Sequence, residues 1–172
     1  MRINVRSATS NDVSPIASLT AQVQELHARS YPTLFKADVS TRELEDAVRH
    51  HLGDNNQRVL VAVRDSLLVG YARLEVQRRP ETVVKVSRAE LYIHEFRVDH
   101  QARASGVGSA IIAHIADVAR VEGIQRIGVD VFARNEEARL FYESRGFKVE
   151  RVARWLIPSA QGSAMPLCGS VC

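Results

Sequence analysis

The sequence predicts an α/β or α+β fold in which a mixed β-sheet carries helices on both faces. Two observations lead to this prediction. Segments with apolar residues at helical spacing alternate along the chain with short segments rich in valine and isoleucine. Two neighbouring segments of the second kind are separated only by RDS at 64–66, which favours an antiparallel hairpin. The expected order of elements is β-α-α-β-β-β-α-β-α-β.

The first half of the chain supplies two helices and three strands. Thr9 to Asp12 offer N-cap chemistry for the first helix. Ser40 and Glu43 form a capping box for the second helix, which Gly53 ends. The strands are expected at 2–7, 59–63 and 67–76, followed by a loop at 77–82.

The second half repeats a strand-helix order. An apolar helix is expected to end near Gly123, and a later one to open at Asn135, run through Tyr142 and close at Gly146. The strands are expected at 83–98, 126–132 and 147–158. The small-residue tail at 159–172 has no usable period and is expected to pack weakly.

Composition narrows the class of protein. The 172 residues suit one domain, and the net charge of +3 comes without a basic run of the kind that binds nucleic acid. No segment is long and apolar enough for a membrane span or secretory signal, so we expect a cytoplasmic protein that binds neither nucleic acid nor membrane. Cys168 and Cys172 lie far from any histidine, so neither a metal site nor a disulfide framework is expected.

The stretch RASGVG at 103–108 lies between a predicted strand and a predicted helix. Gly106 and Gly108 let the backbone approach a ligand, and the N–H groups of a first helical turn favour a phosphate. A P-loop is excluded because no lysine follows Gly108 in the required register. A dinucleotide fingerprint is excluded because position 111 is isoleucine rather than glycine.

A second motif follows at a fixed distance. In NEEARLFYESRGF, Asn135 is followed seven residues later by Tyr142 and then by Gly146 and Phe147. Together with R-x-x-G-x-G, this pattern resembles the GCN5-related N-acetyltransferase (GNAT) superfamily over roughly residues 2–158, most stringently at 91–147. The resemblance implies a single N-acetyltransferase domain over 1–158, with a mostly antiparallel sheet whose central strands splay apart.

The resemblance also implies how acetyl-CoA, the co-substrate, is bound. The pyrophosphate would be held by the backbone N–H groups of Ala104, Ser105, Gly106, Val107 and Gly108, and Ser109 would lie at the helix start. Arg103 would flank it, although a surface arginine needs no such role. The strand carrying Phe96 and Val98 would pair with the pantetheine arm through its main chain. Asn135 would reach the same arm, cap its own helix, or do both.

The resemblance places Tyr142 at the family's general-acid position, where a phenol suits protonation of a leaving thiolate. The alternative is that Tyr142 only packs its helix. For the base, both His94 and Glu95 are candidates, and an unbroken strand would turn only one of them toward the acceptor. A bulge would change that choice. We rank Glu95 narrowly first, because acidic residues are frequent at this position in relatives. The argument for His94 is that histidine has the better intrinsic pKa for a base.

The expected function is therefore transfer of acetyl from acetyl-CoA to a primary amine by direct attack in a ternary complex. The acceptor is open, whether a small molecule or an amine of a protein or peptide. Its specificity is expected from the segment at 77–90 and from the loop at 27–40, where His27, Tyr31 and Phe35 form either a pocket wall or an apolar plug. Family members often dimerise, so a homodimer is a candidate assembly. The rival function is an acyl-CoA-binding sensor or interaction module with the same fold and no catalysis.

Overall fold

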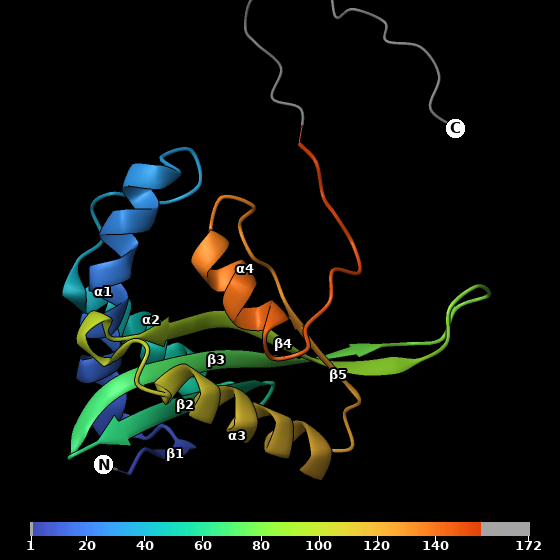
Figure 1. Ribbon diagram of the computed structural model, residues 1–172, viewed down its shortest axis with the longest axis horizontal. Helices are drawn as coiled ribbons and strands as arrows, with labels where there is room; N and C mark the ends of the chain where they lie inside the picture. The colour runs from blue at the N-terminus through green and yellow to red at the C-terminus, as the bar shows by residue number, and fades with distance from the viewer. Residues whose placement is uncertain (1, 156–172) are drawn as a thin grey trace, which may run out of the picture. The chain divides into compact units, whose positions relative to one another are not determined.

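The computed structural model of the protein describes residues 2–155 (Figure 1). The chain divides into two compact units, Met1–Asp130 and Val131–Cys172. The single domain expected over 1–158 stays a prediction, and the expected tail at 159–172 lies outside the described residues.

The first unit is built on a five-stranded sheet in the order β1-β2-β3-β4-β5. Its strands are β1 (Asn4–Ser7), β2 (Gln57–Arg64), β3 (Leu67–Arg79), β4 (Arg88–Val98) and β5 (Arg126–Val129). The first four strands pair antiparallel, and β5 pairs parallel with β4. The predicted mixed, mostly antiparallel sheet is confirmed.

The helices of the first unit cover both faces of this sheet (Figure 1). They are α1 (Val13–Ser30), α2 (Thr41–Gly53) and α3 (Val107–Val121), with short 3-10 turns η1 (Ser10–Asp12) and η2 (His100–Ala102). The predicted capping box begins α2, since Glu43 N donates to Ser40 Oγ and Ser40 N to Glu43 Oε2. The second unit contains α4 (Glu136–Glu143).

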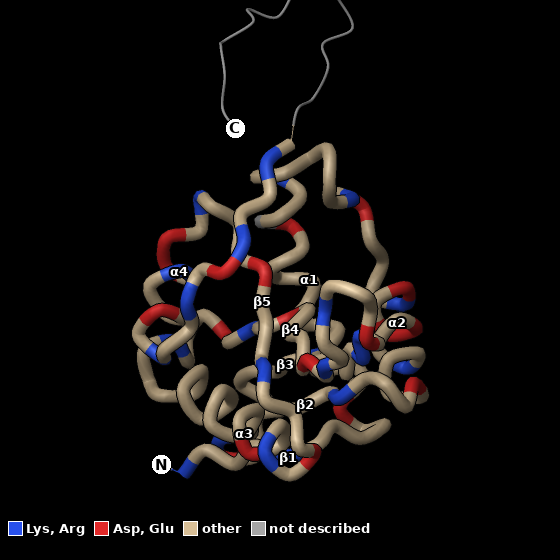
Figure 2. Tube along the Cα trace, turned by 90° about the vertical axis from the view of Figure 1, so that its right-hand side faces the viewer, with Lys and Arg blue, Asp and Glu red and all other residues tan. Residues whose placement is uncertain are grey.

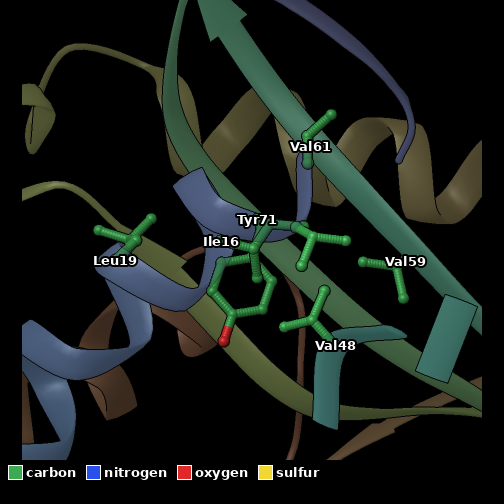
Figure 3. Close-up of a cluster of buried hydrophobic side chains, with 7 residues drawn as sticks. Ile16, Leu19, Val48, Val59, Val61 and Tyr71 are labelled. Carbon is green, nitrogen blue, oxygen red and sulfur yellow. The ribbon is translucent and has the colours of Figure 1, made fainter. Parts of the chain in front are cut away.

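Two adjacent residues of β3 show how the faces differ. Tyr71 lies in an apolar cluster beneath α1 and α2 (Figure 3). The members of this cluster are Val13, Ile16, Leu19, Val48, Val59, Val61 and Tyr71. Gly70 faces α3, where an added Cβ would come 2.9 Å from the Arg97 carbonyl oxygen and 3.2 Å from Ile111. Glycine at this position therefore lets α3 pack closely on the sheet.

The hairpin between β3 and β4 corrects two predicted boundaries. The pairing of β3 with β4 extends to Arg79 and Arg88, so β3 includes part of the expected loop and β4 begins later than 83. The connection contains a tight turn closed by a bridge between Thr82 and Lys85. The valines at 83–86 suggested a strand by composition, but they are exposed where the chain reverses direction.

The later strands also differ from prediction. β5 ends at Val129 rather than 132, because it pairs with β4 only over residues 90–93. The final strand expected at 147–158 is wrong over residues 147–155, which form no strand, and 156–158 lie outside the described residues. Valine alternation in this segment is therefore not matched by a ladder partner within the described part of the chain.

Candidate functional site

The turn before α3 brings the predicted phosphate-binding residues together. Residues 103–106 are exposed, and the helix begins at Val107, with Gly106 as N-cap in the left-handed region at φ 88°. Ala104 is also left-handed, at φ 55°, a conformation that costs about 1 kcal/mol for a residue with a Cβ. The exposed turn therefore leads directly into the N-terminus of α3, where the positive end of the helix dipole lies, whereas Val107 and Gly108 of the first helical turn are themselves buried.

A residue missed by sequence reasoning flanks this turn. Arg64, at the end of β2, donates through Nη1 to Ser105 Oγ at 2.9 Å, and Ser105 Oγ donates to the Ala102 carbonyl at 2.6 Å. The hydroxyl of Ser105 is thus engaged within the protein. Arg64 adds a second cation, besides Arg103, near the predicted pyrophosphate site. No local pattern relates Arg64 to a turn about 40 residues away.

The central strands separate next to this turn, as predicted. β4 remains paired with β3 as far as Val98, whereas its pairing with β5 stops at Ile93 and Val129. The segment of β4 that carries Phe96 and Val98 therefore runs beyond β5. An extended ligand could pair there with main-chain groups, as in strand addition to a sheet edge.

A β-bulge decides how the two candidate bases point. Leu74 pairs with Ile93 and Arg73 pairs with Glu95, so His94 is the extra residue in β4. Such an insertion resets the alternation of side chains. Glu95 contacts Tyr71 and His94 contacts Glu75, and these two partners lie on the same face of β3. Both His94 and Glu95 therefore face the side of the sheet covered by α1 and α2.

Glu95 is surrounded by donors. Tyr71 Oη donates to Glu95 Oε2 at 2.5 Å, Arg73 Nε donates to Oε1 at 2.7 Å, and Arg97 Nη2 lies 3.6 Å from Oε2. Burial of the carboxyl works to raise its pKa, but the Tyr71 hydrogen bond and the charges of Arg97 and Arg73 outweigh it. The pKa of Glu95 is lowered as a result. Burial and the Glu95 charge raise the pKa of Tyr71 to about 12.

The space beside Glu95 is small. A cavity of about 20 Å³ is bordered by Glu95, Arg73, Tyr71 and His51, together with apolar residues of α1, α2 and β2. That volume accommodates one water molecule, and the polar lining offers it partners. Burial, followed by the charge of Arg73, lowers the pKa of His51. Glu95 is thus enclosed by protein on the side where it faces α2.

His94 has a different environment. Its Nε2 lies 2.6 Å from Glu75 Oε2, and its ring centroid lies 5.1 Å from that of Tyr92. Tyr92 in turn packs on Gly128 of β5, where an added Cβ would come 3.0 Å from the Tyr92 ring. The pKa of Glu75 is lowered by hydrogen bonds from Gln77 and from His94. Glu75 was not identified from sequence, because it lies 19 residues from His94.

The second unit carries the other two predicted residues. Asn135 Oδ1 accepts from Ala138 N at 3.0 Å, which confirms Asn135 as the N-cap of α4. Tyr142 is buried, and its ring contacts those of Phe141 and Phe147. Burial raises the pKa of Tyr142 above the ordinary value, so the phenol stays protonated at neutral pH.

The loop expected to set acceptor specificity begins within α1. The ring of Phe35 lies 4.8 Å from that of His27 and 6.4 Å from that of Tyr31. Burial, then the charge of Arg97, lowers the pKa of His27. The three aromatic residues therefore form one cluster, which is compatible with either role expected for them.

A membrane-spanning helix and a metal-binding cluster are both absent from residues 2–155. No helix in this part of the chain is long and apolar enough to cross a membrane. Nor does it hold a group of three or more His, Cys, Asp or Glu residues placed to bind a metal ion. Basic and acidic residues are interspersed along the trace (Figure 2). The cytoplasmic location stays a prediction.

Known proteins share this arrangement. The chain is 24% identical over 147 residues to the uncharacterized N-acetyltransferase YhfO of Bacillus subtilis, covering 85% of this chain and 90% of the relative. A mutant of the BH1408 protein from Bacillus halodurans superposes with a TM-score of 0.83 at 23% identity, over 90% of this chain and 99% of that one. A predicted acetyltransferase from Clostridium acetobutylicum, solved with acetyl-CoA, has a TM-score of 0.67 at 18% identity, over 92% and 96% of the two chains.

A mixed sheet whose central strands separate beside the start of a helix is typical of acyl-CoA-dependent acetyltransferases. The model of the Acetyltransferase (GNAT) family matches residues 20–147, more than half of the chain, and the protein belongs to that family. It is an acetyltransferase that uses acetyl-CoA.

Proposed function

We propose that the protein transfers the acetyl group of acetyl-CoA to a primary amine, which attacks the thioester directly in a ternary complex. The observation that carries this proposal is the position of the α3 turn next to the separation of β4 from β5. The pyrophosphate of an extended CoA would bind backbone N–H groups of the turn, and its pantetheine arm would lie along the edge of β4. The acceptor is a small-molecule amine or an amine of a protein or peptide.

In this proposal the pyrophosphate is bound by the amides of residues 104–109. Arg103 and Arg64 supply positive charge, which strengthens hydrogen bonding to an anion. The main chain of β4 at Phe96 and Val98 pairs with the pantetheine arm. Asn135 already caps α4, so a contact with CoA would use its amide nitrogen.

Acetyl-CoA supplies an activated acyl group whose C–S bond breaks as the C–N bond forms. A base at the bulge of β4, Glu95 or His94, takes the proton that the amine must lose. Tyr142 gives a proton to the sulfur. Burial raises the pKa of Tyr142, so the phenol still holds its proton at neutral pH when the thiolate forms, although it is a weaker acid than a free phenol.

The test combines binding and turnover. Wild type should be stabilised thermally by CoA and should consume acetyl-CoA when supplied with a panel of polyamines, amino acids, aminoglycosides and peptides. Tyr142→Phe should lower kcat about 100-fold and leave CoA affinity nearly unchanged. An unchanged kcat would remove Tyr142 from the acid role. Stabilisation by CoA without turnover of any amine would instead support the non-catalytic module.

Arg64 provides a test of the binding site that does not depend on the acceptor. Arg64→Ala should weaken CoA binding about three- to tenfold, as expected for loss of one charge-assisted contact at the surface. The matched control is Arg42→Ala, an exposed arginine of α2, which should leave CoA affinity unchanged. Equal affinities of wild type and Arg64→Ala would exclude Arg64 from the site.

A further inference from the structure

The bulge in β4 places two possible bases on one face, and their surroundings separate them. Glu95 accepts hydrogen bonds from Tyr71 and Arg73 and lies near Arg97. On the side that faces α2, Glu95 meets a cavity of about 20 Å³, too small for an acceptor amine. A carboxylate with two arginines and a lowered pKa is a poor proton acceptor.

His94 lacks these restrictions. Its side chain is 29% exposed, and the ring is held from two sides by Glu75 and Tyr92. The 2.6 Å contact joins Glu75 to Nε2, so the other ring nitrogen, Nδ1, is not the atom engaged by that carboxylate. A carboxylate that orients one imidazole nitrogen sets the tautomer and makes the other nitrogen the proton acceptor.

We propose that His94 is the general base of the acetyl transfer and that Glu75, through its hydrogen bond with Nε2, is the residue that positions it. This inference rests on the proposed function and selects between the two candidates for its base. His94 Nε2–H donates to Glu75, and Nδ1 takes the proton of the attacking amine. The amine nitrogen bonds to the acyl carbon, the C–S bond breaks, and the thiolate is protonated by Tyr142.

Glu95 then has a positioning role. It neutralises Arg73 and Arg97 beneath the bulge and so stabilises the part of β4 from which His94 projects. The ionisable groups on this face include Tyr71, Arg73 and Glu75 of β3, Tyr92, Glu95 and Arg97 of β4, His27 of α1 and His51 of α2. Glu75 is the carboxylate that the structure bonds to the imidazole of His94.

The kinetic experiment compares acceptors that do and do not need a base. It uses the alkylamine of the panel that wild type acetylates fastest, and hydroxylamine, which is largely unprotonated at neutral pH, with the uncatalysed rate subtracted. His94→Asn should lower kcat/KM about 100-fold or more for the alkylamine and less than about threefold for hydroxylamine. Glu75→Gln should lower it about tenfold for the alkylamine, because the imidazole loses the carboxylate that orients it. Glu75→Asp should recover part of the rate.

Matched controls are His50→Asn and Glu25→Gln, two exposed residues outside the site, which should retain the wild-type rate. A readout independent of turnover is the ¹⁵N spectrum of the His94 ring. It should show the Nε2–H tautomer in wild type and a mixture of tautomers in Glu75→Gln. An Nδ1–H tautomer in wild type would overturn the proposal.

The kinetic outcomes distinguish a wrong assignment of His94 from a wrong proposed function. If wild type acetylates amines but His94→Asn keeps its rate, or loses it equally with hydroxylamine, the assignment of His94 is wrong while the proposed function stands. A rate lost in Glu95→Gln but kept in His94→Asn would make Glu95 the base. If wild type acetylates no amine, the proposed function fails, and the base assignment fails with it.

Discussion

Glu95 and Glu75 are carboxylates on the same face of the same sheet, yet they differ in exposure and in the charge of their partners. Glu95, 22% exposed at its side chain, is held by Tyr71 and Arg73 of the neighbouring strand β3 and by Arg97 of its own strand. Glu75, 34% exposed, is held by Gln77 and by His94. The first carboxylate balances buried positive charge, whereas the second is available to orient an imidazole. Residue type alone therefore does not indicate which acid serves catalysis; the number and charge of its partners do.

The largest expected effect on folding tests this contrast directly. Glu95→Gln leaves Arg73 and Arg97 without a counter-charge, so it should lower the free energy of unfolding by about 2 to 3 kcal/mol. Glu75→Gln breaks a more exposed contact and should cost less than about 0.5 kcal/mol. Urea unfolding at pH 7 measures both values. Similar losses for the two variants would remove the distinction between them.

A third carboxylate, that of Asp12, has no candidate catalytic role and should make the stability of the protein depend on pH. The Arg6 guanidinium, which donates to both oxygens of Asp12, lowers the pKa of that carboxyl from 3.8 to about 2. The resulting stability is complete above the unfolded pKa and is lost as pH falls from roughly 5 toward 2. Asp12→Asn should therefore cost about 2 kcal/mol at pH 7 and much less near pH 2. Unfolding curves at pH 7, 4 and 2 provide the measurement, and a pH-independent difference would contradict the assignment.

A smaller effect than that of Glu95→Gln is expected from removal of the hydroxyl that links Glu95 to α1. Tyr71 Oη donates to Glu95 and lies 2.7 Å from Thr20 Oγ1, while its ring packs in the apolar cluster of Figure 3. Tyr71→Phe keeps the ring and should lower the free energy of unfolding by about 1 kcal/mol. If Glu95 is structural, the variant should keep the pH profile of kcat/KM. A shifted profile would indicate that Glu95 takes part in proton transfer.

Local sequence signals were sufficient for several parts of the molecule. The capping box of Ser40 with Glu43 and the cap of Asn135 on α4 depend on residues three apart, and both are present. Gly106 adopts the left-handed conformation that suits the start of α3. The family motifs predicted the fold class, which was confirmed. Each of these features is set by neighbours along the chain.

The remaining features arise from pairing between distant segments. The strand expected at 83–98 became a turn and a shorter strand, because the register of β3 with β4 places the reversal there. The same register inserts His94 as a bulge and puts Glu75, 19 residues away, at its ring. Arg64 reaches Ser105 only because β2 ends beside the α3 turn.

By itself the sequence determined the helix starts, the glycine turn before α3 and the family, since short-range backbone geometry and motif spacing depend on residues that are close together in the chain. Which acid is enclosed and which meets the imidazole was decided only by the tertiary structure. A one-residue offset between two strands turns side chains to opposite faces, and that offset depends on how the whole sheet packs beneath α1 and α2.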